Sequence, residues 1–145
     1  MSSLKSPINA LAEKLGLGAL TFEEGMCSIQ FDAHVFNFHV DEVQSELLCF
    51  LRVIDIPQDP EKRLALYRRL LITSAFGRGA GGGHLGVDET EAFVVFSRAV
   101  PAEGLSVDRL ELIVELMLDM VESFQREWVE DAAPENAGPP AGIRV

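Results

Sequence analysis

A glycine-rich segment in the middle of the chain is the first place where the residue types could do chemistry. Residues 77–89 read GRGAGGGHLGVDE, and Gly77, Gly79 and Gly82 match the G-x-G-x-x-G pattern of phosphate-binding loops. Such a loop needs a strand before it and a helix after it, so that the pyrophosphate meets a helix N-terminus. Here a predicted helix precedes the glycines, a predicted strand follows them, and no G-K-S/T is present. We therefore interpret the segment as a helix-to-strand connection and expect no cofactor.

The other side chains able to do chemistry are too scattered to indicate an active site. His34, His39 and His84 are the only histidines, and the odd spacing of the first two places them on opposite faces of a strand. A metal site needs several converging ligands, so we expect none. Cys27 and Cys49 stand alone in apolar runs, which predicts buried, unreactive thiols. No nucleophile signature such as G-x-S-x-G occurs, so the sequence predicts no catalytic residue and a protein that is not an enzyme.

Composition and charge exclude several classes of partner. The chain has 145 residues, of which 48% are hydrophobic, and a net charge of −11. This length and hydrophobic content are enough for one domain with a core. The negative net charge predicts an acidic surface, which repels nucleic acids and anionic membranes. No apolar run approaches the roughly 20 residues of a membrane span, and Glu13 and Lys14 interrupt the N-terminal apolar segment. We expect a cytoplasmic protein that binds neither nucleic acid nor membranes.

The elements that must position any site follow from periodicity. A 3.6-residue apolar period predicts three helices, over residues 6–15, 59–76 and 106–130. Alternating patterns predict five to six strands within residues 19–56 and 84–100. Clustered strands flanked by helices predict a single α+β domain with an antiparallel twisted sheet over residues 1–131. Residues 132–145 are rich in Pro, Gly and Ala and are typical of a flexible tail.

Two of the predicted strands are apolar on both faces. The run ELLCFLRVIDI at residues 46–56 and the run FVVF at residues 93–96 carry apolar residues at successive positions. One small core covers one face of a sheet, so the other face needs a second layer. We expect a second copy of the chain or a client segment to supply it.

An acidic stripe follows the last predicted helix. Its members are Asp108, Glu111, Glu115, Asp119 and Glu122. Such a stripe is usually a solvated helix face, and the alternative is a docking surface for a basic partner.

Several motifs in the second half of the chain occur together in one known family. They are a glycine-rich lead, an L-G-V-D turn at residues 85–88, an apolar strand at residues 93–96, a loop containing Pro101 and a long last helix with Trp128 near its end. In this the chain resembles the class I type III secretion chaperones, the CesT/SycE-like (Tir chaperone) family. The opening helix followed by LGL, with the LTF and CSIQF runs, is also similar to the family, and the resemblance covers residues 5–130.

The resemblance implies a homodimer without catalytic activity. It would bind the N-terminal chaperone-binding segment of one or more secreted effectors and keep that segment soluble, with the secretion ATPase as a further candidate partner. The family's dimer contact uses the second helix and a neighbouring strand, which correspond to Leu48, Phe50, Ile54, Leu64, Tyr67 and Leu71. The family's client grooves lie near the first helix and the sheet, which correspond to Leu11, Leu15, Leu20, Phe22, Ile29, Phe36 and Phe38.

Three rival hypotheses stay open from the sequence. A regulatory protein of the same fold would sequester an anti-activator of type III secretion gene expression instead of an effector. An enzyme with a cofactor at the glycine segment would show saturable nucleotide binding. A CesT-like domain unrelated to secretion would have no client and would be stable when expressed alone.

Overall fold

The structure is a computed structural model that describes residues 5–18, 20–77 and 82–132. Within these residues the chain forms three α-helices, one short 3-10 helix and five strands. In chain order they are α1 (Lys5–Lys14), β1 (Met26–Phe31), β2 (His34–Asp41), β3 (Glu46–Asp55), α2 (Pro60–Ser74), η1 (Ala75–Gly77), β4 (His84–Val87), β5 (Phe93–Pro101) and α3 (Val107–Ala132). The predicted α+β class is confirmed. Residues 133–145 of the expected tail and residues 78–81 of the glycine segment lie outside the described residues.

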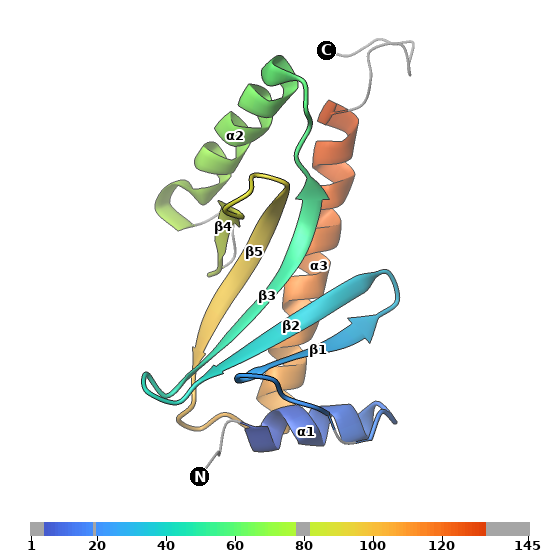
Figure 1. Ribbon diagram of the computed structural model, residues 1–145, viewed down its shortest axis with the longest axis vertical. Coiled ribbons are helices and arrows are strands. Elements are labelled where there is room, and N and C mark those ends of the chain that lie inside the picture. The colour runs from blue at the N-terminus through green and yellow to red at the C-terminus, as the bar shows by residue number, and fades with distance from the viewer. Residues whose placement is uncertain (1–4, 19, 78–81, 133–145) are drawn as a thin grey trace.

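The five strands form one antiparallel sheet in the order β1-β2-β3-β5-β4 (Figure 1). Residues 20–22, which belong to the first stretch of predicted strand, form no strand, and Glu23 and Met26 make only a single bridge. A helix precedes the glycine segment and β4 follows it, as the sequence predicts. Gly83 packs so closely on β5 that a Cβ there would lie 2.7 Å from the Phe96 ring, which gives this glycine a packing role.

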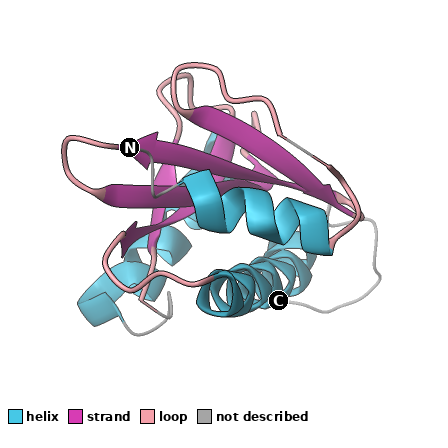
Figure 2. Cartoon of the chain, turned by 90° about the horizontal axis from the view of Figure 1, so that it is seen from below, coloured by secondary structure: helices cyan, strands magenta, loops and turns pink. Residues whose placement is uncertain are grey.

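One face of the sheet carries the core. Alternate strand residues point toward α1 and α3, which both lie on that side of the sheet (Figure 2). Burying each large side chain of this kind contributes about 1.5–3 kcal/mol. The phenyl ring of Phe124 stacks on Trp128 with ring centroids 4.7 Å apart. The sheet contributes Cys27, Ile29, Phe36, Phe38, Val40, Leu47, Cys49, Leu51, Val53, Val94, Phe96 and Val100, and the two helices contribute Ile8, Leu11, Ala12, Leu110, Ile113, Val114, Met117, Val121, Phe124 and Trp128.

Polar contacts fix the two helices on this face. The Lys14 ammonium donates to Glu111 on α3 over 2.6 Å, which ties the end of α1 to the start of α3. Further along α3, the Gln125 side-chain amide donates to the carbonyl oxygen of Val53 over 2.8 Å. Both contacts join segments far apart in sequence, so they set the position of α3 across the sheet.

The opposite face of the sheet has no cover from α1 or α3 (Figure 2). Leu48 and Phe50 point to this face and stay half-buried, while Leu47, Cys49 and Leu51 are buried on the core side. The expectation that the strand now identified as β3 is apolar on both faces is therefore confirmed. The guanidinium of Arg52 lies 3.9 Å from the ring centroid of Phe93, and this cation–π contact shields part of the open face.

Candidate protein-binding surfaces

Helix α2 begins where the sequence predicts and has apolar residues on two sides. The Asp59 carboxylate caps its first turn by accepting from the backbone N–H of Lys62 over 3.0 Å, and Pro60 occupies the first turn. Leu66 and Leu70 are buried against the core. On the other side, the side chains of Leu64 and Leu71 are 70% and 75% exposed.

These two exposed leucines belong to a shallow apolar hollow. We call it the α2 face, and it has a volume of about 440 Å³. Two exposed leucines that line one apolar hollow form a candidate protein-binding surface. The α2 face is lined by Glu61, Leu64, Ala65, Tyr67, Arg68 and Leu71.

One hydrogen bond orients the α2 face relative to the sheet. The Tyr67 hydroxyl donates to the carboxylate of Glu91, in the turn between β4 and β5, over 2.6 Å. This bond is the largest cause that raises the pKa of the Tyr67 phenol above its ordinary value of 10.0. Tyr67 thus has its ring at the rim of the hollow and its hydroxyl fixed by a strand turn.

The turn that carries Glu91 is itself built around one carboxylate. Asp88 accepts hydrogen bonds from the hydroxyl and backbone N–H of Thr90 and from the backbone N–H groups of Ala92 and Phe93. The Thr90 hydroxyl is the largest cause that lowers the pKa of Asp88 to about 2. The carboxylate stays ionised at neutral pH and keeps the turn in the shape that holds Tyr67.

The residues expected at the dimer contact fall on two elements. Leu64, Tyr67 and Leu71 lie together on the α2 face. Leu48 and Phe50 lie on the open face of the sheet, whereas the β-bulge after Arg52 pairs Ile54 with buried Val94 and places it on the core side. The contact between copies stays a prediction for both groups.

The residues expected to touch a client divide by burial. Leu11, Ile29, Phe36 and Phe38 are in the core, at most 2% exposed, so in this conformation their side chains offer no surface to a client. These four buried side chains lie beneath the exposed residues of the region. Leu15 is 42% exposed, while Leu20 and Phe22 are half-buried at the edge of the core.

Sequence reasoning missed one residue of this region. Leu17 follows α1 and is 50% exposed, two positions after Leu15. The Lys5 ammonium lies over the ring of Phe22, 5.1 Å from the centroid of that ring. We call the exposed part of this region, Leu15, Leu17, Leu20 and Phe22, the α1–β1 surface. The LGL run at residues 15–17 could have indicated this exposure, because a leucine that lies between two glycines after the end of a helix has few neighbouring side chains to pack against.

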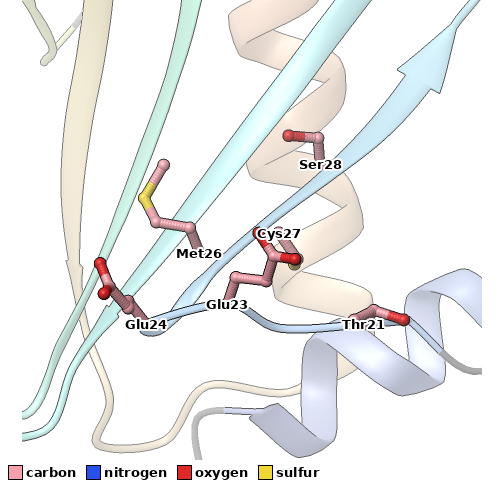
Figure 3. A pocket seen from close by; sticks show the side chains of 6 residues that line it. All are labelled: Thr21, Glu23, Glu24, Met26, Cys27 and Ser28. Carbon is pink, nitrogen blue, oxygen red and sulfur yellow. The ribbon is translucent and has the colours of Figure 1, made fainter.

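Strand β1 is one end of the sheet and pairs only with β2 among the described residues. Its outer edge therefore offers backbone N–H and C=O groups to another chain. A polar hollow of about 660 Å³ opens beside the start of this edge (Figure 3). It is lined by Thr21, Glu23, Glu24, Met26, Cys27 and Ser28.

The groups that could do chemistry do not converge. Burial raises the pKa of the Cys27 thiol to about 11 and that of Cys49 to about 12, so both stay protonated and unreactive at neutral pH. His34 lies 3.5 Å from the Glu122 carboxylate on α3. Within residues 5–18, 20–77 and 82–132, no group of three or more His, Cys, Asp or Glu residues is placed to hold a metal ion. None of the helices in the described part of the chain is long and apolar enough to cross a membrane.

Known structures share this arrangement of elements. The ExsC–ExsE complex contains a chain with 24% identity and a TM-score of 0.75, and the match covers 86% of this chain and 92% of that one. The HopA1–SchA chaperone–effector complex gives 21% identity and a TM-score of 0.62, covering 88% and 94%. The Yersinia pestis type III secretion chaperone SycH, in complex with a fragment of YscM2, gives 19% identity and a TM-score of 0.61, covering 81% and 96%.

A search of curated proteins gave no match. The model of the Tir chaperone protein (CesT) family matches residues 6–125, which is most of the chain and nearly all of the described fold. The element order, the sheet and the three helices agree with the type III secretion chaperones among the similar structures. The chain belongs to the Tir chaperone protein (CesT) family.

Proposed function

We propose that this chain is a cytoplasmic type III secretion chaperone that acts as a homodimer. In this function it binds the N-terminal segment of one or more secreted effectors and keeps that segment soluble and competent for secretion. The observation that carries the proposal is the α2 face, where Leu64 and Leu71 remain exposed on a member of the CesT family whose core is otherwise well filled.

The α2 face supports association with a second copy. Leu64 and Leu71 are seven residues apart, which places them two turns apart on the same side of the helix. When two such helices pair in antiparallel fashion about a two-fold axis, Leu64 of each copy faces Leu71 of the other. A symmetric dimer requires this kind of self-complementary surface.

The α1–β1 surface and the β1 edge support client binding. An extended client segment can add backbone hydrogen bonds along the outer edge of β1 while its apolar side chains cover Leu15, Leu17 and Phe22. Binding of a long segment buries much apolar surface and can be tight despite the ordering cost. The net charge of −11 favours encounter with basic segments.

The acidic stripe on α3 supports a further contact. Glu111 pairs with Lys14 and Glu122 lies near His34, whereas Glu115 and Asp119 are exposed and form no ion pair within the described residues. A basic component of the secretion apparatus, with the secretion ATPase as the candidate, would find this side of the helix open.

The test is affinity capture of the tagged chain from its native cells, followed by mass spectrometry and light scattering of the eluted complex. We expect two copies of the chain with one secreted protein, and loss of that protein when its N-terminal segment is deleted. A dimer that holds a small regulatory protein would instead favour sequestration of an anti-activator. A monomer with no partner would contradict both functions.

A further inference from the structure

The middle residue of η1, two positions after the end of α2, is an aromatic in an unusual backbone conformation. Phe76 has φ 61° and ψ 7°, in the left-handed region where a side chain with a Cβ is disfavoured. Among the described residues, the other non-glycine positions with positive φ are all polar and lie in turns that precede or connect strands. They are Glu24, Asp32, Ser45 and Glu91.

Contacts within the described chain do not compensate for this conformation. The Phe76 side chain is 95% exposed, and its ring makes no ring–ring or cation–π contact with a described residue. Asn or Gly would adopt the same backbone conformation with less strain and would expose less apolar surface. Strain that local packing does not support is characteristic of positions that serve a contact.

Phe76 extends the exposed apolar surface of α2. Leu71 and Ile72, in the last turns of the helix, are 75% and 63% exposed, and Phe76 lies two residues beyond the end of the helix. Glu61 and Arg68 supply one charge of each sign on the α2 face, so this face does not select a strongly basic or acidic partner. In an antiparallel pair of α2 helices, the seven-residue spacing of the two leucines places each leucine opposite the other leucine of the second helix. This self-complementarity points to a second copy of the chain as the partner that covers the α2 face.

We propose that Phe76 is an aromatic anchor in the contact between two copies of this chain, and that its left-handed backbone conformation presents the ring to the second copy. This proposal rests on the homodimer proposed above. In an antiparallel pairing of two α2 helices, the end of one helix lies beside the start of the other. Phe76 of each copy therefore reaches the first turn of the other copy's α2, where an aromatic ring can fill space that leucines leave open.

The experiment compares four variants of the full chain with the wild type by sedimentation velocity over a dilution series, and one of them, Leu71→Asp, places a charge on the α2 face. Phe76→Asn removes the ring and suits the left-handed conformation, and Phe76→Tyr keeps the ring. Val43→Asn makes the same kind of change at a position that is 91% exposed in the turn between β2 and β3. Urea unfolding of each variant, followed below the dimer dissociation constant, reports the stability of the single chain.

We expect Phe76→Asn to raise the dimer dissociation constant about tenfold or more, as the loss of an aromatic anchor does. Its single chain should be at least as stable as the wild type, because the strain is relieved. Phe76→Tyr and Val43→Asn should keep the wild-type dissociation constant. An unchanged constant for Phe76→Asn, with Leu71→Asp dissociating the dimer, would overturn the role of Phe76 and leave the homodimer intact. A wild-type chain that is monomeric at every concentration would overturn the homodimer and this inference with it.

Discussion

Leu71→Ala should weaken the dimer strongly and leave the single chain almost unchanged. Complete burial of a leucine side chain contributes about 1.5–3 kcal/mol. Leu71 is 75% exposed in the single chain, so covering it contributes about 1–2 kcal/mol, and a symmetric dimer covers it twice. The loss of about 2–4 kcal/mol corresponds to a rise of roughly 30- to 700-fold in the dimer dissociation constant.

The assay is sedimentation equilibrium of the wild type and the variant at several concentrations, with urea unfolding to follow stability. Because Leu71 is exposed on an isolated chain, its truncation should change the free energy of unfolding by no more than about 0.5 kcal/mol under conditions where the chain is monomeric. Leu112→Ala is the matched control, since Leu112 is 52% exposed on α3. Equal dimer dissociation constants for the two variants would refute the assignment of the contact to α2.

The remaining predictions concern the client surface, the core and the tyrosine. Leu17→Asp should weaken binding of a client's N-terminal segment, measured by fluorescence anisotropy, while Leu112→Asp should not; equal affinities would remove Leu17 from the surface. Phe38→Ala should lower the free energy of unfolding by about 3–5 kcal/mol in urea titrations, because the ring is fully buried, and a loss below about 1 kcal/mol would contradict its place in the core. Tyr67 is the only tyrosine, so absorbance at alkaline pH follows it alone, and in the folded protein it should titrate above pH 10.0. Because the pKa of Tyr67 is raised on folding, its contribution to the stability of the fold is complete below the pKa of the unfolded chain and is lost as pH rises through the pKa of the folded chain. Glu91→Gln should lower the pKa of Tyr67 in the folded protein. An identical titration curve would show that the hydrogen bond does not form.

Periodicity predicted the three helices because apolar residues recur along one side of each, and it predicted β1 and β2 because buried and exposed residues alternate along them. Asp59 and Ser106 cap α2 and α3, since the side-chain oxygen of each accepts from the backbone N–H three residues on. The short strand expected near residue 20 does not form. A single bridge between Glu23 and Met26 replaces it, since their mutual hydrogen bonds close a tight turn there.

The candidate surfaces were harder to predict, because apolar pattern does not reveal which apolar side faces the core. Leu64 and Leu70 look alike in the sequence, yet Leu70 is buried and Leu64 is exposed. The family resemblance placed Phe36 and Phe38 among the client residues, whereas both side chains are fully buried in the core. The left-handed conformation of Phe76 and the hydrogen bond from Tyr67 to Glu91 depend on tertiary structure, and the local sequence carries no sign of either.

The most direct test of the central claim is the mass of the purified chain with and without a captured client, measured by light scattering coupled to size-exclusion chromatography. We expect a dimer alone and, with the client, two copies of the chain bound to one secreted protein. We also expect the client to dissociate when its N-terminal segment is removed. A monomer that elutes without a partner would contradict both the homodimer and the chaperone function.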